Sequence, residues 1–246
     1  MYMRMKAIIG AMAVVAVMMA GAPEMMAQGA GGGRSGASAK AIKAVNFDKY
    51  AAENAALPPL RKGEKRVVFL GSSITEGWQT ERPEFFKSNG YLGRGISGQS
   101  TYALLLRFRP DVIDLNPTCV VIGAGEPDIA AGDDAYSEDR TFANIVSMCE
   151  LARMHGIKVV LTSVLPAEGY YWNQGATGIP DKIESLNRRI KAYAQANRLA
   201  YADYYTPLVH PGDRAIAVTF SDDGVHPNRF GYTIMEPIIS AILKKM

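Results

Sequence analysis

A serine that directly follows a predicted buried strand is the first candidate for chemistry in this sequence. Ser73 lies in Gly71-Ser72-Ser73-Ile74-Thr75, where a strand is expected to turn sharply into a helix. Such a turn exposes the hydroxyl, and the N–H groups and dipole at a helix start favour developing negative charge. The same serines could instead cap the helix, because a side-chain oxygen there accepts a backbone hydrogen bond. A second group is needed to decide between the two interpretations.

A histidine with an aspartate three residues earlier supplies that group. A nucleophilic serine needs a base, and the base needs a carboxylate to orient it. Asp223 and His226 are close enough in a loop to contact each other directly, which leaves the second ring nitrogen for the serine. His155 is expected to cap a helix end, and His210 has no acidic residue at the same spacing. We therefore predict a catalytic triad of Ser73, His226 and Asp223.

Short apolar segments alternate with segments of helical spacing through the rest of the chain. The expected strands are residues 66–70, a weaker strand ending at Ile96, and residues 118–122, 157–162 and 199–203. The expected helices are a short one within 41–62, followed by 100–108, 139–154, 181–197 and 231–244. The last helix is expected to be interrupted by Pro237. This alternation predicts an α/β domain with a parallel sheet and helices on both faces. Ligands bind beyond the carboxyl ends of such strands, which is where the predicted triad falls.

The first 40 residues are expected to lie outside this domain. Residues 1–27 have a basic start, an apolar run and a small residue, Ala27, at a candidate cleavage point, as in a signal peptide. Residues 28–40 are rich in glycine, alanine and serine, which is typical of a flexible linker, and residues 41–246 remain as a single domain. We predict a secreted or periplasmic bacterial protein with no stable membrane association after cleavage, although the apolar run would also suit an uncleaved anchor.

Composition excludes several other classes of function. A formal net charge of +3 without any cluster of basic residues argues against nucleic-acid binding. Cys119 and Cys149 lack metal-ligand spacing and are expected as small buried residues rather than as a disulfide. The glycines at 93, 95 and 98 match a dinucleotide-binding pattern, but they follow the second strand and not the first. No metal and no organic cofactor are expected.

Three stretches of the chain resemble sequence blocks of the GDSL/SGNH hydrolases. Residues 67–78 resemble the first block, 95–98 the second and 223–227 the last, in the same order and with similar spacing. The resemblance runs from about residue 66 to the C-terminus and is closest to secreted bacterial acylhydrolases. It implies a flavodoxin-like three-layer α/β/α sandwich with a five-stranded parallel sheet. It also implies that Ser73 is the nucleophile and first oxyanion donor, and that the N–H of Gly98 is the second donor.

The sequence departs from that family pattern at two positions. Ser72 occupies the place of the Asp in the first block, a largely structural position. The third block, normally Gly-x-Asn-Asp with the Asn as third oxyanion donor, reads Gly125-Glu126-Pro127-Asp128. Pro127 has neither a side-chain donor nor an N–H, and one such donor is typically worth about a hundred- to a thousandfold in rate. Either two donors suffice, or Gln99 or Asn173 substitutes, or activity is low.

The resemblance and the triad together predict a serine esterase acting on carboxylic esters. Its substrates are expected to be short O-acyl groups, such as acetyl, on carbohydrate or other small molecules. The residues expected to bind substrate are Trp78, Gln99, Tyr171, Trp172 and Asn173, although some of the aromatic rings could instead cover the core. The alternative is a weak or inactive member of the family that binds glycan without cleaving it.

Overall fold

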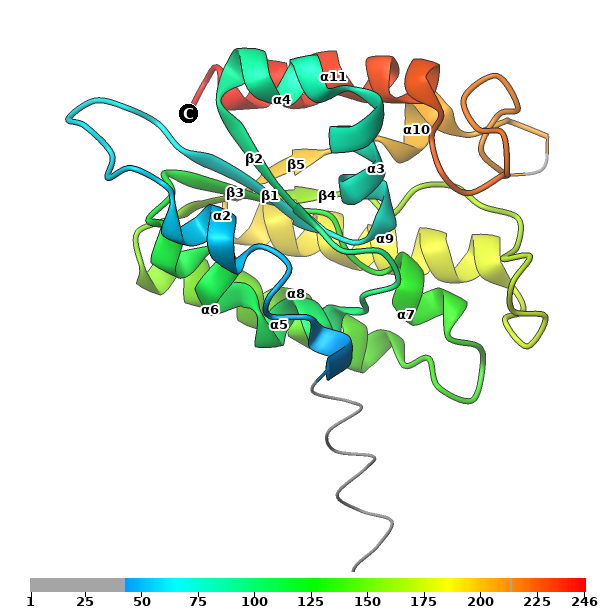
Figure 1. Cartoon of the computed structure of the whole chain (residues 1–246). Helices are drawn as coiled ribbons and strands as arrows, with labels where there is room; N and C mark the ends of the chain where they lie inside the picture. The colour runs from blue at the N-terminus through cyan, green and yellow to red at the C-terminus, as the bar shows by residue number, and fades with distance from the viewer. Residues whose placement is uncertain (1–42, 213) are drawn as a thin grey trace, which may run out of the picture.

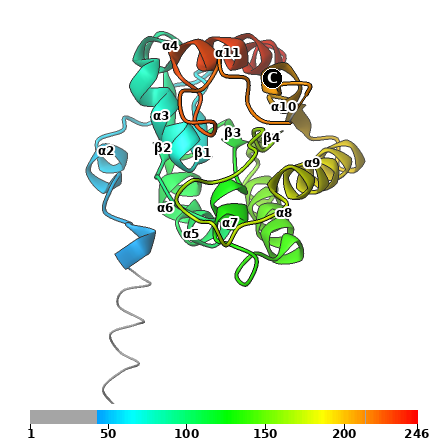
Figure 2. The ribbon, with the colours of Figure 1, turned by 90° about the vertical axis from the view of Figure 1, so that its right-hand side faces the viewer.

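The computed structural model describes residues 43–212 and 214–246 of the chain. At their centre is a five-stranded parallel sheet in the order β2-β1-β3-β4-β5 (Figure 1). Its strands are β1 (Val67–Gly71), β2 (Tyr91–Gly95), β3 (Cys119–Ile122), β4 (Lys158–Thr162) and β5 (Ala200–Ala202). Because the strands are parallel, all their carboxyl ends lie at the same end of the sheet. Figure 2 shows the molecule viewed from this end. The predicted signal peptide (1–27) and linker (28–40) lie outside the described residues.

Successive side chains along each strand point alternately into two hydrophobic clusters, one on each face of the sheet. In β1, Val68 and Leu70 pack into one hydrophobic cluster, whereas Val67 and Phe69 pack into another on the opposite face. The same alternation continues in β3 and β4. A parallel sheet covered on both faces needs apolar side chains at every position, which explains why the strands are uninterrupted apolar runs in the sequence.

Helices cover both faces of the sheet, so the fold is the expected three-layer α/β/α sandwich (Figure 1). The first cluster is covered by α5 (Thr101–Leu106), α6 (Phe108–Asp111), α7 (Glu126–Ala130), α8 (Glu138–Met154) and α9 (Ile179–Ala196). The second is covered by α3 (Ser73–Glu81), α4 (Pro83–Asn89), α10 (Tyr205–Leu208) and α11 (Arg229–Leu243), while the short α2 (Ala51–Ala55) precedes β1. The apolar side chains of α9 recur at 183, 186 and 190, the spacing of one helix face.

The predicted strands and long helices are confirmed, with small shifts at their ends. The short helices α4, α7 and α10 were not predicted, because segments of four to seven residues carry too few turns to show a helical period. The expected interruption at Pro237 is wrong, since α11 continues through it. Pro237 removes one N–H donor, but Met235, Ile239 and Leu243 stay buried in the second cluster and hold the helix together.

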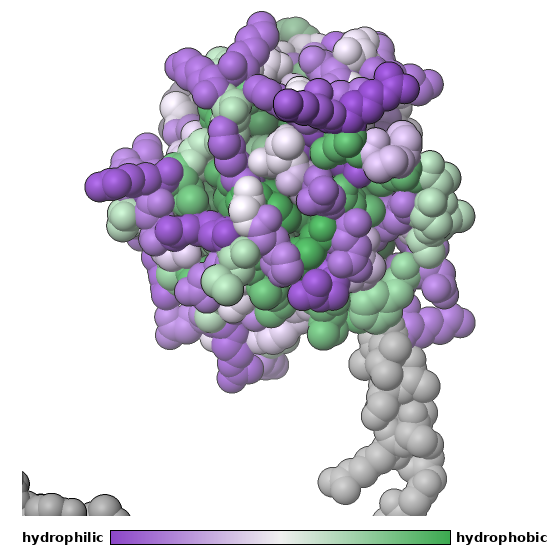
Figure 3. Space-filling model, turned by 90° about the vertical axis from the view of Figure 1, so that its left-hand side faces the viewer, coloured by the Kyte–Doolittle hydropathy of each residue, from purple (hydrophilic) through white to green (hydrophobic). Residues whose placement is uncertain are grey.

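Both cysteines are buried thiols on opposite sides of the sheet. Cys119 belongs to the cluster under α3 and α11, and Cys149 to the cluster under α8 and α9. No helix among residues 43–212 and 214–246 has the length and apolar character needed to cross a bilayer. The face at the amino ends of the strands carries hydrophilic side chains scattered among small apolar areas (Figure 3).

Candidate active site

The turn between β1 and α3 presents one of its two serines and buries the other. A side chain on Gly71 would collide with Thr75 and with the carbonyl of Gly123, so only glycine allows the helix to start this close to the sheet. Ser72 precedes the helix, is 1% exposed, and its hydroxyl has no hydrogen-bond partner in the described structure. Ser73 is the first residue of α3 and faces a surface cleft.

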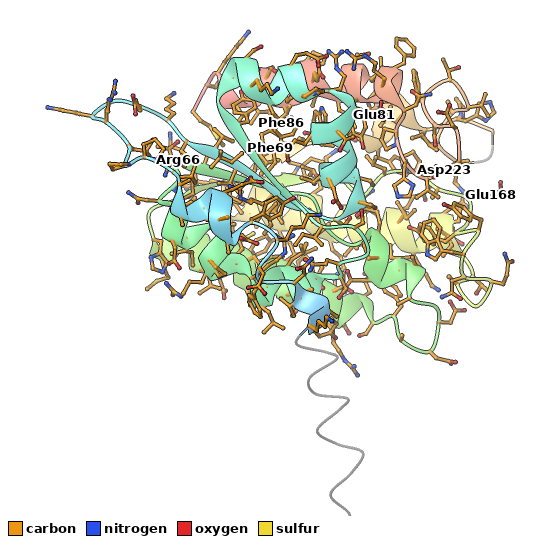
Figure 4. The ribbon with its side chains drawn as sticks, in the orientation of Figure 1. Arg66, Phe69, Glu81, Phe86, Glu168 and Asp223 are labelled. Atoms are coloured by element: carbon orange, nitrogen blue, oxygen red, sulfur yellow. The ribbon has the colours of Figure 1, made fainter. Side chains whose placement is uncertain are left out.

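Ser73, His226 and Asp223 form one continuous line of hydrogen bonds. The Oγ of Ser73 lies 3.0 Å from Nε2 of His226, and Nδ1 of His226 lies 2.7 Å from Oδ2 of Asp223. The serine comes from the turn after β1, and the other two come from the loop before α11, about 150 residues later. Figure 4 shows Asp223 at the opposite end of the sheet from Arg66, which precedes β1. The triad thus lies beyond the carboxyl ends of the strands.

The loop of Asp223 is shaped around its own carboxylate. Oδ1 accepts hydrogen bonds from the N–H groups of Val225 and His226, at 2.9 and 2.8 Å, and from the hydroxyl of Ser221. Burial alone would raise the pKa of Asp223, but the hydrogen bonds from the His226 ring and these N–H groups outweigh it and lower the pKa to about 2. Asp223 is therefore ionised at neutral pH and can orient the imidazole throughout catalysis.

The loop of Gly98 is fixed next to Ser73 by a glutamate on α3. Oε2 of Glu76 accepts hydrogen bonds from the N–H and the hydroxyl of Ser97, both at 2.6 Å, and Oε1 forms an ion pair with Lys49. Gly98 has a φ of 75°, a conformation that favours glycine, and lines the cleft with Ser73. Glu76 and Lys49 were missed by sequence reasoning, since nothing in the spacing links them to residue 97.

Hydrogen bonds from neighbouring helices hold the segment around Pro127 in place. Pro127 is the second residue of α7, where a missing N–H costs the helix nothing, and it lines the cleft beside Ser73. The buried carboxylate of Asp128 accepts hydrogen bonds from the N–H and hydroxyl of Thr101, at 2.9 and 2.6 Å, and from the hydroxyl of Thr141 at 3.3 Å. These bonds tie α7 to α5 and α8, so the backbone at residue 127 is held by groups other than the proline ring.

A cleft of about 510 Å³ opens over Ser73 and His226. Its lining is mainly apolar and aromatic, and includes Ile74, Ala130, Ala131, Tyr170, Tyr171, Trp172 and Val225. The indole of Trp172 is stacked near the ring of His226, with centroids 6.0 Å apart and 26° between the planes. Two further grooves, of about 520 and 450 Å³, reach Asp223 and have more polar linings. The first shares His226 with the cleft, and the second shares Tyr170 and Tyr171 with it.

Two of the expected substrate-binding residues lie elsewhere. Trp78 is 2% exposed and stacks against Phe85 and Tyr232 in the core, because five residues of helix turn it roughly 140° away from Ser73. Gln99 is 4% exposed; its amide donates to the carbonyl of Val45 and its oxygen accepts from Arg107. Neither side chain faces the cleft, so the expectation that they contact substrate is wrong.

Asn173 also has other hydrogen-bond partners. Its amide nitrogen donates to the carbonyl of Ala130 at 2.9 Å, and its oxygen accepts from the N–H of Gly175 at 3.0 Å. These contacts shape the aromatic loop, and Asn173 is not among the residues that line the cleft over Ser73, so its amide is not placed to reach an oxyanion there. Tyr171 and Trp172 are the two expected residues that are exposed and line the cleft.

Hydrogen bonds connect a serine to a histidine and the histidine to an aspartate, at the carboxyl end of a parallel sheet. This is the geometry of a serine hydrolase triad. The chain belongs to the GDSL-like lipase/acylhydrolase family, whose family model matches residues 69–234. The members of this family are hydrolases of the esterase type. A GDSL-like lipase of Bacteroides thetaiotaomicron VPI-5482 is 53% identical, with a TM-score of 0.80, over 82% of this chain and 98% of that chain.

Two curated proteins are more distant relatives. The uncharacterized lipoprotein YqeF of Bacillus subtilis (strain 168) is 31% identical over 122 residues, which is 43% of this chain and 50% of that protein. An acetylxylan esterase of Xylanibacter ruminicola is 22% identical over 224 residues, covering 76% of this chain and 45% of that esterase. The chain therefore spans about half the length of the curated relatives it matches.

Proposed function

We propose that this protein is a serine esterase in which Ser73 forms a covalent acyl-enzyme. The hydroxyl of Ser73 attacks the ester carbonyl while Nε2 of His226 takes its proton, and Asp223 holds the imidazole in the required tautomer. The protonated His226 then gives the proton to the leaving alcohol. A water, deprotonated by His226, releases the acid and restores Ser73. The observation that carries the proposal is the unbroken hydrogen-bond line from Ser73 to Asp223.

The N–H groups of Ser73 and Gly98 are proposed to bind the oxyanion. The first N–H groups of a helix have no partner within it, and Ser73 opens α3. Gly98 lines the same cleft on a loop held by Glu76. Glu76 thus acts as a positioning residue, because it fixes the second donor relative to the first.

Short acyl groups on carbohydrate are the proposed substrates. The cleft is apolar next to Ser73, as an acetyl group requires, and Tyr171 and Trp172 offer exposed rings on which a sugar could stack. The polar grooves beside Asp223 could hold neighbouring sugars. The distant acetylxylan esterase is consistent with this substrate class. An envelope or extracellular location, supported by the lipoprotein relative, would give access to such polymers.

The substrate proposal is tested by acyl-chain and polymer assays on the full chain. We expect kcat/KM to be highest for acetyl esters in a series of phenyl acetate, butyrate and octanoate, and acetate to be released from acetylated xylan. Highest kcat/KM for octanoate would contradict the short-acyl assignment. Binding to acetylated xylan without release of acetate would instead favour the glycan-binding alternative, which the absence of a side-chain donor at Pro127 supports.

Trp172→Ala is expected to raise KM for an acetylated xylo-oligosaccharide about tenfold, while KM for phenyl acetate changes less than about threefold. The reason is that the truncation removes the apolar area that the indole would bury against a sugar, about 25 cal/mol per Å², so that losing roughly 55 Å² of contact gives about 1.4 kcal/mol, a factor of ten. Tyr102→Ala is the matched control, since Tyr102 is similarly exposed, at 48% against 49%, and does not line the cleft. Equal KM changes for both substrates would argue against a sugar platform at Trp172.

If the N–H groups of Ser73 and Gly98 are the only oxyanion donors, Pro127→Asn should raise kcat at least about tenfold with little change in KM. An Asn amide at this position would add a donor to the oxyanion hole, and such a contact strengthens only as negative charge develops. The bonds of Asp128 to Thr101 and Thr141 should keep the α7 backbone in place when the proline ring is removed. Pro127→Ala, which adds no donor, controls for loss of the ring. An unchanged kcat in folded Pro127→Asn would mean that another group already supplies the third hydrogen bond.

A further inference from the structure

Glu126 is a carboxylic side chain at the site to which the proposed mechanism assigns no role. It lines the cleft together with Ser73, Gly98 and Pro127. It also lines a small cavity of about 20 Å³ behind the nucleophile turn, next to Thr75 and Thr162. The carboxyl therefore forms part of the wall between the cleft and the protein interior. It immediately precedes the residue at which a third oxyanion donor was expected.

The surroundings of Glu126 favour its neutral form. Its Oε2 is enclosed by protein and has no hydrogen-bond partner in the described structure, and a buried charge without partners is costly. Burial raises the pKa of Glu126 to about 7, although the backbone N–H groups of Glu126 and Leu165 oppose the shift. Among the ionisable groups around it, Asp128 on α7 raises this pKa and His226 lowers it. Tyr170, after β4, and Tyr232, on α11, also face Glu126, and both phenols are neutral at this pH.

We propose that Glu126, as a neutral carboxylic acid, donates the third hydrogen bond to the oxyanion in place of an asparagine. The inference rests on the proposed ester hydrolysis at Ser73. As the carbonyl oxygen becomes negative, the O–H of Glu126 donates to it, and the proton stays on Glu126 throughout. When the tetrahedral intermediate collapses, the carbonyl reforms and the hydrogen bond weakens. No oxidant, metal or additional reactant is needed. A carboxyl kept neutral by an apolar site can act as an oxyanion donor in this way.

Other candidate donors fit less well. The side chains of Gln99 and Asn173 are engaged in structural hydrogen bonds. The hydroxyl of Tyr170 is also enclosed and unpartnered in the described structure, and Tyr170 lines the cleft. A phenol, however, remains a donor far above pH 7, whereas a carboxylic acid loses its donor when it ionises. The pH dependence of kcat therefore distinguishes the two.

We expect kcat to have a bell-shaped dependence on pH. At acid pH kcat is low, because the general base of the mechanism must be unprotonated. The kcat also falls as pH increases through about 7, because Glu126 then ionises, stops donating and places a negative charge beside the oxyanion. Glu126→Gln keeps an N–H donor that does not titrate, so its kcat should remain on a plateau up to pH 9. Below pH 7, Glu126→Gln should lose far less kcat than Glu126→Leu, because the amide still offers a hydrogen-bond donor.

The experiment compares wild type, Glu126→Gln, Glu126→Leu and Tyr170→Phe on phenyl acetate from pH 5 to 9, with acid release followed by titration. We expect kcat of Glu126→Leu to fall about a hundredfold, at the lower end of the value of one donor. Tyr170→Phe should keep the bell. A wild-type kcat that is flat above pH 7, or a Glu126→Leu variant as active as wild type, would overturn the proposal. So would a large loss in Tyr170→Phe with none in Glu126→Leu.

A second measurement tests the proposal without the Glu126→Leu variant, and so does not depend on whether that variant folds. Carboxyl carbon NMR of protein labelled with 13C-glutamate, with Glu126→Gln to assign the signal, should show Glu126 titrating near pH 7. Titration near the ordinary value of about 4.3 would overturn the proposal without reference to activity. Failure of ester hydrolysis as such is recognised separately, by a wild type that neither turns over phenyl acetate nor reacts with a fluorophosphonate.

Discussion

Ser73→Ala should lower kcat/KM for phenyl acetate by at least about a thousandfold and abolish labelling by a fluorophosphonate. Removing the nucleophile of a triad removes the covalent route, and only the oxyanion contacts and substrate binding remain. The side chain contributes little to the fold, because it is half-buried at the cleft and its described side-chain partner is His226. Steady-state kinetics and labelling on folded protein, checked by circular dichroism, measure the effect.

Ser72→Ala is the matched control for this prediction. Ser72 is adjacent in the chain, fully buried, and its hydroxyl has no hydrogen-bond partner in the described structure. We therefore expect labelling and kcat/KM within about threefold of wild type. Loss of labelling in Ser72→Ala with retention in Ser73→Ala would reverse the assignment of the nucleophile.

Asp223→Asn should lower kcat at least about a hundredfold and leave KM nearly unchanged. The carboxylate has two separate tasks, because Oδ2 contacts the His226 ring while Oδ1 accepts the N–H groups of Val225 and His226. An amide has only one accepting oxygen, so one of these contacts must fail. If the NH2 group faces His226, the imidazole adopts the tautomer with its proton towards Ser73 and can no longer act as a base. If it faces the backbone, the loop that holds His226 loses its shape.

Asp222→Asn serves as the control, since Asp222 is the neighbouring acid and its described contact is with Asn228. Its kcat should stay within about threefold of wild type. A folded Asp223→Asn variant with kcat close to wild type would show that the carboxylate does not orient the base. The pKa of Asp223, lowered to about 2, also predicts that loss of activity between pH 6 and 4 does not come from this group.

The parts of the site that the sequence indicated are those in which neighbours in sequence are also neighbours in space. Asp223 and His226 contact each other within one loop, and Ser73 directly follows a strand whose apolar run is easy to recognise. The parallel sheet was predictable for the same reason, because its strands are short apolar runs covered on both faces. The structure then shows that the carboxyl ends of the strands bring these two segments together.

The residues that sequence reasoning missed or misplaced depend on contacts between distant segments. Glu76 holds Ser97 from another element, and the polar contacts of Gln99 come from residues 44, 45 and 107. Trp78 has the residue type of a sugar-stacking side chain, yet its position around α3 directs it into the aromatic core. Glu126 was passed over because a glutamate in a loop is usually solvated, and only the packing around α7 shows that its Oε2 is enclosed.

The central claim is that Ser73 becomes acylated by the substrate. The most direct measurement is peptide mass spectrometry of the full chain after reaction with a fluorophosphonate, followed by trypsin. The reactive serine lies in the peptide of residues 67–87, since Arg82 is followed by proline and resists cleavage. Fragment ions separate Ser72 from Ser73 within it. We predict a single stoichiometric adduct on Ser73 that is absent in His226→Ala. An adduct on Ser72 or on a residue outside this peptide, or equal labelling of His226→Ala, would contradict the account.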